Sequence, residues 1–331
     1  MNKKWIDMIK RMSIIIALPL GMFLILSFLT SLQGVQLFNN AGHVQTFVRS
    51  TAIIAFTAWA LALNLNSGRF DFSLGSMALL SSIVGTQLTI MFDLPAVFLI
   101  ILTVLIGGLL GFISGMIYII LKLPPIITSV GVMLLYEALS FIVTRGEGLL
   151  ISTQFQLLTL PTTRNLLIIL IVGFLFMYIL MNYTRFDYNH KALQHGQEIA
   201  VKTGIQEKRN AVATYAITGM LMGVVGFINI SAQGFASVAL NFSSISAMFI
   251  AFLPLFIGGY IGRYSEERFG ILIGAVTMGI VTLGFVRLDV AYYNQEFINA
   301  ILLVLFLAYL NNEGKLSSLF KYNRKTTLNT R

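Results

Sequence analysis

The chain has 331 residues, of which 57% are hydrophobic and only 11% are charged, against about 25% charged residues in soluble domains. A soluble globule of this size could not cover so much apolar surface, so the composition predicts an integral membrane protein. The absence of cysteine and the scatter of the three histidines exclude disulfides, cysteine nucleophiles and the usual metal-ligand patterns. We therefore expect no metal, no cofactor and no catalytic residue.

Ten apolar runs long enough to cross a bilayer as helices follow one another along the chain. They cover residues 12–32, 44–66, 72–91, 95–121, 125–144, 165–183, 211–232, 245–262, 268–286 and 293–311. The first run is too long for the hydrophobic part of a signal peptide and lacks a cleavage site, so we expect it to be kept as a helix. The sequence predicts an all-α polytopic membrane protein with about ten transmembrane helices in a single domain over residues 1–331.

The basic residues lie mostly on one side of this arrangement. When the loops are assigned to the two sides in turn, 18 of the 22 Lys and Arg residues fall on the side that holds both termini and the tail 312–331. Those on or near the other side are Arg49, Arg145, Arg164 and Arg287. Because basic residues mark the cytoplasmic side, both termini are predicted to be cytoplasmic. Topology in a lipid bilayer thus explains the net charge of +9, and we expect no nucleic-acid partner.

A faint internal repeat divides the chain into halves at about 12–144 and 165–311. The stretch Ser73–Ala78 in the third run resembles Ser244–Phe249 in the eighth. Five crossings in each half is an odd number, so matching halves would be inverted relative to one another, as in many transporters. Chance similarity between helices rich in small residues is the alternative.

Glycines four residues apart predict places where two helix backbones pack closely, since glycine has no Cβ atom to hold them apart. The glycines are Gly107, Gly111, Gly115, Gly219, Gly223, Gly270 and Gly274. We interpret them as packing residues.

The stretch 68–75 between the second and third runs combines charge with flexible backbone. Gly68 and Gly75 flank Arg69, Asp71 and Ser73. One interpretation is a solvated turn with a local Arg69–Asp71 pair and Ser73 capping the next helix. The other is a discontinuous helix that lines a transport path or its gate, where irregular backbone is tolerated because it faces protein or water.

Two further features lie around the fifth run. Pro124 and Pro125 end one helix and begin the next, which predicts a tight hairpin. Glu137 lies inside the apolar run, and a carboxylate within the membrane is a candidate functional residue. The alternative is a Glu137 that is paired, or that extends to water near the outer interface.

The longest polar loop, 184–210, lies on the basic side. Its segment Ala192–Ile205 has the pattern of one or two short amphipathic helices, with Gly204 suited to the position just after a helix. Leu193, Ile199 and Ala200 offer a small apolar surface that a soluble protein could grip, unless the helix lies on lipid. The candidate contact residues are Ala192, Glu198, Ile199, Ala200, Gly204 and Ile205.

Together these stretches resemble the permease subunits of bacterial ATP-binding-cassette (ABC) importers of the ribose/monosaccharide type, which are related more distantly to nucleoside and branched-chain amino-acid permeases. The family motif Gly-Gly-x-Asp-Leu-Ser-Val-Gly is matched at Gly68, Asp71, Ser73 and Gly75, with Arg69 in place of the second glycine. The resemblance covers roughly residues 50–310.

Two more family motifs follow in the same order. The motif Pro-Pro-x-Ile-x-Thr-Leu-Gly-x-Met is matched at Pro124, Pro125, Ile127, Gly131 and Met133, and the loop motif Ala-Ala-x-x-x-Gly-Ile at Ala200, Gly204 and Ile205. After the eighth run, the segment 263–269 replaces a second Gly-Gly cluster of the family.

The resemblance implies a multi-pass protein of the bacterial cytoplasmic membrane that is not itself an enzyme. Two permease chains, identical or different, would form the pathway, and each would dock its 190–205 segment into a cytoplasmic ABC ATPase. An extracellular or periplasmic solute-binding protein would deliver a small polar solute. A pathway poor in charge favours a neutral polar solute. The resemblance makes a sugar the first expectation, with nucleosides or amino acids as the alternatives. The chain itself has no Gly-x-x-x-x-Gly-Lys-Ser/Thr phosphate loop, so ATP hydrolysis would belong to a partner.

Two rival classes stay open. An ion-coupled secondary transporter needs acidic residues in the membrane, and Glu137 and Asp71 are the candidates. A membrane enzyme acting on lipid-linked substrates needs Asp, Glu or His clustered at one interface, which the sequence does not show.

Overall fold

The computed structural model describes residues 3–151 and 154–328. Within these ranges ten helical segments are long and apolar enough to cross a membrane, as the sequence predicts. They are α1 (Lys3–Leu32), α2 (Ala41–Asn66), α3 (Leu74–Met91), α4 (Val97–Leu121), α5 (Pro125–Thr144), α7 (Thr163–Tyr183), α10 (Glu207–Gln233), the segment Ser243–Gly262, α13 (Glu267–Arg287) and α14 (Tyr292–Leu328).

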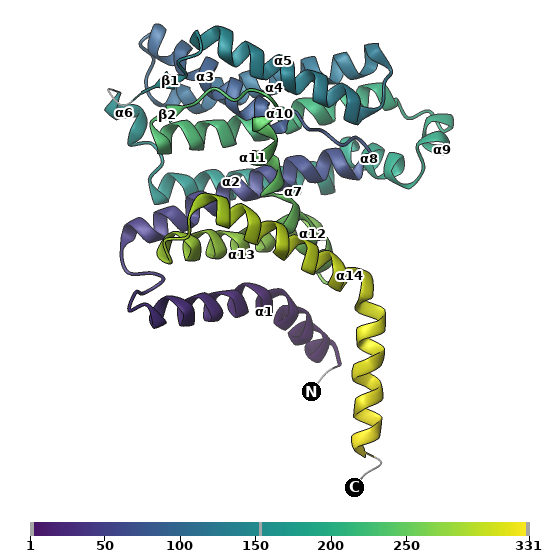
Figure 1. The fold of residues 1–331 in the computed structure, drawn as a ribbon. Helices are drawn as coiled ribbons and strands as arrows, with labels where there is room; N and C mark the ends of the chain where they lie inside the picture. Colours follow the sequence, from purple (N-terminus) through teal and green to yellow (C-terminus); the bar gives the residue numbers. More distant parts are fainter. Residues whose placement is uncertain (1–2, 152–153, 329–331) are drawn as a thin grey trace.

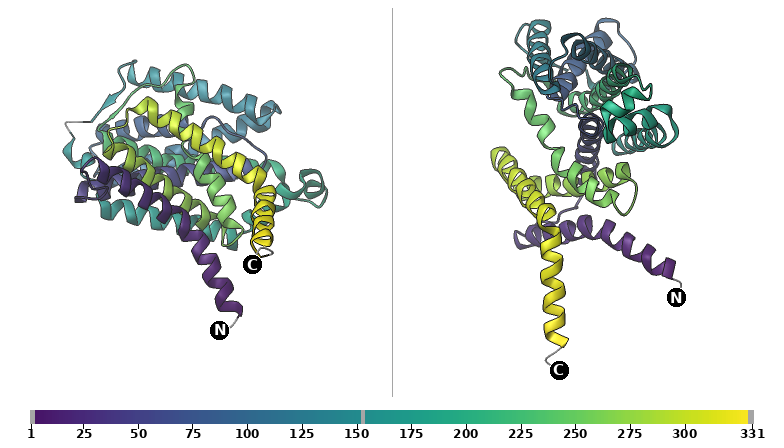
Figure 2. Two further views of the ribbon diagram at one scale, coloured as in Figure 1. Left: turned by 60° about the horizontal axis from the view of Figure 1, so that its bottom comes forward. Right: turned by 90° about the vertical axis from the view of Figure 1, so that its right-hand side faces the viewer.

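Short elements mark the two ends of the bundle. At one end, the strands β1 (Leu149–Leu150) and β2 (Phe235–Ala236) pair antiparallel beside α6 (Phe155–Leu158). At the other end, α8 (Arg185–His195) and α9 (Gln197–Lys202) protrude from the bundle (Figure 1). We call these the α6 end and the α8 end. Helix α1 begins and α14 ends at the α8 end (Figures 1 and 2), as an even number of crossings requires.

Helix α2 lies at the centre of the molecule. The helices α3, α4, α5 and α10 form a group on one side of it, and α12, α13, α14 and α1 lie on the other (Figures 1 and 2). In α2, 72% of the membrane span is buried, against 11% in α1 and none in α14. Trp59 of α2 is fully buried and packs edge-on against Phe56. The two outermost spans therefore present their apolar side chains to lipid.

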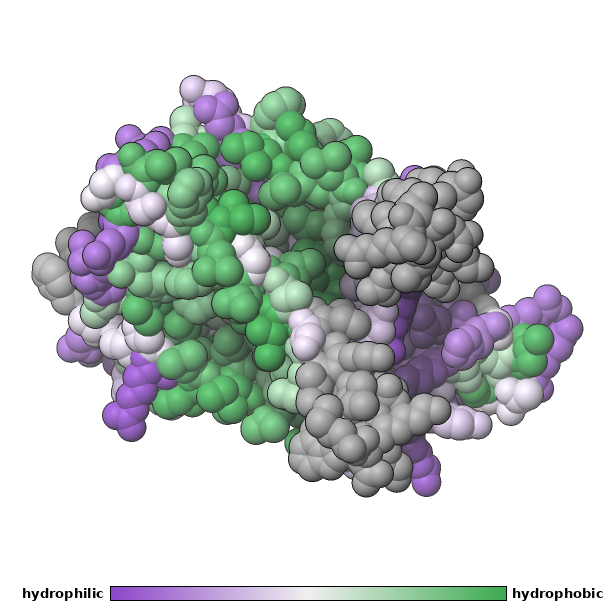
Figure 3. All heavy atoms as spheres, turned by 90° about the horizontal axis from the view of Figure 1, so that it is seen from below, coloured by the Kyte–Doolittle hydropathy of each residue, from purple (hydrophilic) through white to green (hydrophobic). Residues whose placement is uncertain are grey.

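The surface agrees with a membrane environment. Figure 3 shows hydrophobic residues across the middle of the molecule, with hydrophilic residues gathered toward the ends. Phe28 of α1 and Val304 of α14 are 63% and 64% exposed. Water would penalise such exposure, whereas lipid does not.

The predicted glycines lie where helices approach most closely. A Cβ atom on Gly107 would overlap the Gly219 carbonyl of α10, and one on Gly111 would overlap the Tyr215 carbonyl. Further overlaps of this kind involve Gly115 with Val212, Gly223 with Thr103, Gly270 with Gly258 and Gly274 with Pro254. These contacts agree with the packing interpretation, since a side chain there would push the backbones apart.

Two of the helix contacts are equivalent to each other under the internal repeat. Matching the halves span by span equates the fourth span with the ninth and the second with the seventh. In the structure α4 packs along α10, and α13 packs along α2, which are equivalent pairs under that match. The inverted relation of the halves stays a prediction.

The eighth span departs from the expected single helix over 245–262. It consists of a 3₁₀ turn, η1 (Ser243–Ile245), followed by α11 (Ser246–Phe249) and α12 (Phe252–Gly262). Helix α11 crosses between the two groups of helices (Figure 1). Asn241 and Phe242, just before it, have φ angles of 57° and 68°, a left-handed conformation that side chains disfavour. We call residues 237–251 the interrupted segment.

Candidate functional site

The turn after α2 has a defined hydrogen-bonded form. Gly68 adopts a φ of 71°, and its amide donates to the Leu65 carbonyl at 2.9 Å. The Arg69 amide donates to the Asn64 carbonyl, also at 2.9 Å. This pair of bonds is a Schellman motif, in which glycine at the left-handed position ends the helix.

Asp71 organises the rest of this turn from inside the protein. Its carboxylate is fully buried and accepts hydrogen bonds from the Ser73 amide at 2.8 Å, the Ser73 hydroxyl at 2.6 Å and the Asn64 side chain at 3.1 Å. The solvated turn with an Arg69–Asp71 pair is therefore wrong. Ser73 does precede α3, but its hydroxyl binds Asp71 and makes no capping bond.

The start of α3 touches the interrupted segment directly. A Cβ atom on Gly75 would overlap the Ser244 carbonyl, so only glycine permits this approach. On the other side, the Glu137 carboxylate accepts from the Phe242 amide at 3.1 Å, the Ser244 amide at 3.0 Å and the Ser244 hydroxyl at 2.6 Å. Glu137 is 1% exposed, so the alternative that it extends to water is wrong. It holds the backbone where the eighth span begins.

The prolines lie near the same turn. Helix α5 begins at Pro125, after Pro124 in an extended conformation, and Lys122 ends α4 with a φ of 53°. The Ser129 hydroxyl, one turn into α5, reaches the Phe70 carbonyl at 3.4 Å. The expected hairpin is therefore present and contacts the 67–73 turn.

The 184–210 loop forms the two short helices that the sequence predicts. Gly204 ends α9 with a φ of 94°, and the Ile205 amide donates to the Ala200 carbonyl at 3.1 Å. The expected apolar surface is partly wrong, because Leu193 and Ala200 are only 6% and 4% exposed. Leu193 of α8 and Ala200 of α9 are therefore turned toward other parts of the protein and away from a partner. Ile199, 71% exposed, is the residue of the three that a partner could contact.

Family comparison identifies the class of protein. Residues 44–310 match the model of the family described as branched-chain amino acid transport system, permease component. The chain belongs to this family of permeases. The matched region includes the 67–73 turn, α8, α9 and the interrupted segment.

Individual relatives are distant but extensive. The permease is 26% identical over 73% of its length to the fructose import permease protein of Rhizobium meliloti, covering 70% of that protein. It is 26% identical to the L-arabinose ABC transporter permease protein of Azospirillum brasilense, over 84% of this chain and 83% of that one. It is 27% identical to the ribose import permease protein of Haemophilus influenzae, over 81% and 84% respectively. No solved structure gives a significant match.

At the α8 end of the permease, charged residues from four elements meet. We call Arg69, Asp187, His190, Glu207 and Arg268 the α8-end cluster. Arg69, 3% exposed, binds Glu207 at 3.1 Å. Arg268 binds Glu266 at 3.0 Å, and Asp187 binds Lys191 at 2.7 Å. The Arg69–Glu207 pair joins the 67–73 turn to α10. The other two pairs lie within the start of α13 and within α8.

His190 lies inside this cluster. It is 1% exposed and stacks on Phe186 at 5.5 Å between ring centroids. Burial, together with the charges of Arg69 and Arg268, lowers the pKa of His190 to about 4. Neither of its ring nitrogens has a hydrogen-bond partner among the described residues. His190 is therefore neutral near pH 7.

The two departures from the family motifs meet in this cluster. Arg69 replaces a glycine of the first motif, and Arg268 belongs to the segment 263–269 that replaces the second Gly-Gly pair. Both guanidinium groups lower the pKa of His190. The sequence shows each departure separately, but not that they share a neighbour.

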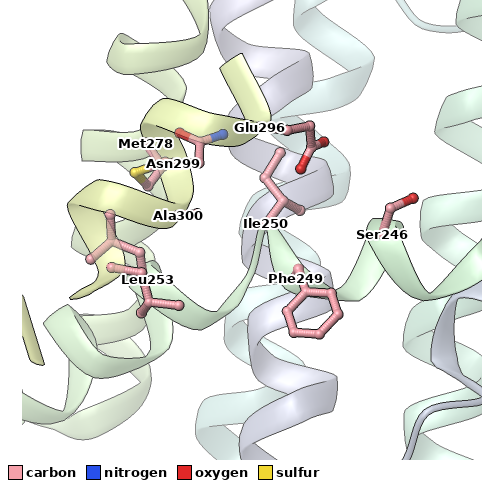
Figure 4. Close-up of a pocket in the computed structure, with 9 residues that line it drawn as sticks. Ser246, Phe249, Ile250, Leu253, Met278, Glu296, Asn299 and Ala300 are labelled. Atoms are coloured by element: carbon pink, nitrogen blue, oxygen red, sulfur yellow. The ribbon is translucent and has the colours of Figure 1, made fainter. Parts of the chain in front are cut away.

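Two cavities flank the interrupted segment. The α3 cavity, about 200 Å³, lies among α3, α10 and β2 and is lined in part by Ser82, Asn229 and Gln233. The α14 cavity, about 190 Å³, lies among α11, α12, α13 and α14 (Figure 4). It is lined by Ser246, Phe249, Ile250, Leu253, Met278, Glu296, Asn299, Ala300 and Leu303.

Sequence reasoning missed the polar residues of these cavities. Glu296 and Asn299 are three positions apart at the start of the tenth span, and Asn229 and Gln233 are four apart at the end of the seventh. Such spacings place side chains on one helix face, which is the signal that could have found them. Within residues 3–151 and 154–328, no group of three His, Cys, Asp or Glu side chains could hold a metal ion.

Proposed function

We propose that the permease is the membrane-spanning subunit of an ABC importer that carries a monosaccharide across the bacterial cytoplasmic membrane. The observation that carries this proposal is the family match over residues 44–310, together with relatives that are import permeases for fructose, arabinose and ribose. A separate ATPase hydrolyses ATP, and the permease provides the gated path. A second permease chain, identical or different, completes that path.

The α8 end is the cytoplasmic end in this proposal, with both termini inside. Lys and Arg concentrate there, as the positive-inside rule requires. The ATPase grips α8 and α9, which protrude from the bundle (Figure 1) and expose Ile199 and Glu198. The solute-binding protein then delivers its cargo at the α6 end.

A chain of buried contacts supports coupling between the ATPase and the path. Helix α8 packs on α10, and Glu207 of α10 binds Arg69 through an ion pair. The turn that carries Arg69 also holds Asp71 and the start of α3. Gly75 of α3 contacts Ser244 of the interrupted segment. The support is contiguity of packed and hydrogen-bonded groups, which is the physical requirement for transmitting a displacement.

The contacts of Asp71 and Glu137 argue against the alternative of an ion-coupled secondary transporter, for which they are the candidate ion-carrying residues. Asp71 and Glu137 are buried, and each accepts three hydrogen bonds inside the fold. A carboxylate that carries ions across a membrane must exchange with water on both sides, and these two instead stabilise backbone turns.

The test is uptake by the reconstituted assembly. The permease is purified with its co-purifying ATPase and binding protein, placed in vesicles, and offered D-ribose, D-fructose or L-arabinose. We expect ATP-dependent uptake of one sugar. Uptake that persists without ATP and collapses with an uncoupler would establish the ion-coupled rival. A binding protein that is stabilised against heat by nucleosides or amino acids, and by no sugar, would change the solute class.

A matched pair of variants tests the docking surface. Ile199→Asp places a charge on the exposed face of α9, and we expect ATPase co-purification to fall while membrane insertion stays normal. Leu150→Asp, 70% exposed at the α6 end, is the control and should leave ATPase binding unchanged. Equal ATPase binding by both variants would remove the docking claim.

A further inference from the structure

The α14 cavity contains a carboxylate that the fold does not use. Asp71 and Glu137 are satisfied by hydrogen bonds, and Glu207 and Glu266 bind arginines. Glu296, half-buried in the first turns of α14, makes no hydrogen bond or ion pair with any residue that the structure describes. An unpaired carboxylate in the membrane region costs free energy. Because Glu296 stabilises no contact within the described structure, we look for its role in binding a molecule that is not part of the chain.

A second polar group next to Glu296 is also unpartnered. The Asn299 side-chain oxygen is buried and has no hydrogen-bond partner among the described residues. Figure 4 shows that the Glu296 and Asn299 side chains both come from α14, with Phe249 and Ser246 on the facing segment. The Ser246 hydroxyl donates to the Ser243 carbonyl at 3.0 Å, which leaves its own oxygen free to accept. An orphaned buried oxygen in a cavity indicates a missing partner.

The chemistry of this lining selects a neutral solute rich in hydroxyl groups. Glu296 can accept hydrogen bonds from two hydroxyls, and the Asn299 amide can both donate and accept. Phe249 and Ile250 provide an apolar wall for the C–H face of a sugar ring. Among the described lining residues there is no Lys or Arg, so an anion would meet the Glu296 charge alone. A hard divalent cation needs six or more oxygen ligands, and a single carboxylate does not supply them.

The α14 cavity lies against the interrupted segment. Its wall includes Ser246, Phe249 and Ile250 of the interrupted segment. Glu137 and Gly75 hold the same segment from its other side through Ser244. A shift of the segment therefore moves one wall of the cavity relative to α14.

We propose that the α14 cavity is a monosaccharide-binding subsite of the transport path, in which Glu296 and Asn299 hydrogen-bond the sugar hydroxyls. This inference rests on the proposed function. It adds a binding site within the membrane to the specificity of the solute-binding protein.

The first test uses the full assembly and the sugar that the wild type imports. Glu296→Ala should lower the uptake rate about tenfold, which corresponds to losing one or two hydrogen bonds to a charged group. Glu296→Gln keeps one acceptor and should lose less. ATP hydrolysis stimulated by the loaded binding protein should stay near the wild-type rate, because the cytoplasmic contacts are intact. Leu305→Ala, which shortens a side chain 61% exposed on another face of α14, is the matched control and should import normally.

The second test uses the absence of cysteine from the chain. Ala300→Cys places a thiol on the cavity lining, and Leu305→Cys places one on a different face of α14, where Leu305 is 61% exposed and does not line the cavity. A charged methanethiosulfonate reagent should modify Ala300→Cys and leave Leu305→Cys unmodified in lipid. The imported sugar should slow the reaction at Ala300→Cys in the assembly, whereas a sugar that is not imported should not.

The outcomes separate the two proposals. If wild-type assemblies import none of the three sugars, the proposed function fails and the subsite fails with it. If one sugar is imported, while Glu296→Ala transports normally and that sugar gives Ala300→Cys no protection, the subsite alone is wrong. Reduced uptake together with protection supports both.

Discussion

The α8-end cluster and the interrupted segment both contain buried charge, but they satisfy it in opposite ways. In the cluster, charged side chains bind one another, as Arg69 of the 67–73 turn binds Glu207 of α10 and Arg268 binds Glu266 at the start of α13. Around the interrupted segment, Glu137 binds backbone amides, and Glu296 and Asn299 are left without partners in the described part of the chain.

This difference separates two mechanical roles. Ion pairs that are desolvated together resist separation, since parting them leaves a buried charge uncompensated. The Arg69–Glu207 pair is therefore suited to keep the 67–73 turn and α10 together. The interrupted segment has few hydrogen bonds of regular helix, and the unpartnered Glu296 and Asn299 of α14 line a cavity beside it. It is suited to change shape and to bind something that is not part of the chain.

We expect the largest loss of stability from breaking the Arg69–Glu207 ion pair of the α8-end cluster. Glu207→Gln leaves the 3%-exposed Arg69 without its counter-charge, at a cost of about 3 kcal/mol in unfolding free energy. Arg69→Gln should cost less, because the Glu207 side chain is 20% exposed and can be hydrated. Denaturation in detergent measures both.

The double variant completes this test. Arg69→Gln with Glu207→Gln removes both charges, so it should recover much of the stability that Glu207→Gln loses. If the two single changes in unfolding free energy simply add in the double variant, the two charges do not interact. The pair would then not hold the 67–73 turn to α10.

We expect the next largest loss of stability from removing the charge that holds the interrupted segment. Glu137→Gln keeps the shape of the side chain but loses a charged acceptor for two backbone amides, which should cost about 2 kcal/mol. Uptake should fall more than expression does, because the segment loses its anchor. Ile142→Ala shortens a side chain that is 67% exposed on the same helix and is expected to change neither. Equal loss of expression and uptake by Glu137→Gln would limit this residue to a structural role.

The contact between the two regions can be tested at Gly75. Gly75→Ala adds a Cβ atom that overlaps the Ser244 carbonyl, and overpacking of this kind costs about 1–2 kcal/mol. Gly131→Ala is the control, since a Cβ atom there meets nothing within 4 Å. We expect Gly75→Ala alone to lower uptake per ATP hydrolysed. Normal coupling would show that the cluster reaches the segment by another route.

The smallest effect is a dependence of stability on pH. The pKa of His190 is about 4 when folded and about 6.5 when unfolded, so the unfolded chain takes up a proton first as pH falls. His190 therefore favours folding above pH 6.5, and this contribution is lost progressively toward pH 4. At pH 5.5 the loss is about 1 kcal/mol. His190→Phe should remove this part of the pH dependence, and identical pH profiles would contradict the burial of a neutral ring.

The sequence by itself determined the features that depend on local pattern. The apolar runs predict ten spans because a bilayer requires about 20 apolar residues in each helix. Gly68 and Gly204 end helices in left-handed conformations, as their neighbours in sequence indicate. The prolines at 124 and 125 start α5 for a similar local reason.

Only the tertiary structure decided which charged groups meet and where the path is interrupted. Glu207 lies 138 positions from Arg69, and Ser244 lies 107 positions from Glu137. The sequence favours the nearer Arg69–Asp71 pair, because chain proximity is the information it contains. The ion pair of Arg69 with Glu207 of α10 replaces that pair. In the same way, the eighth span has the apolarity of a helix, and Glu137 and Gly75 determine that it begins as a turn.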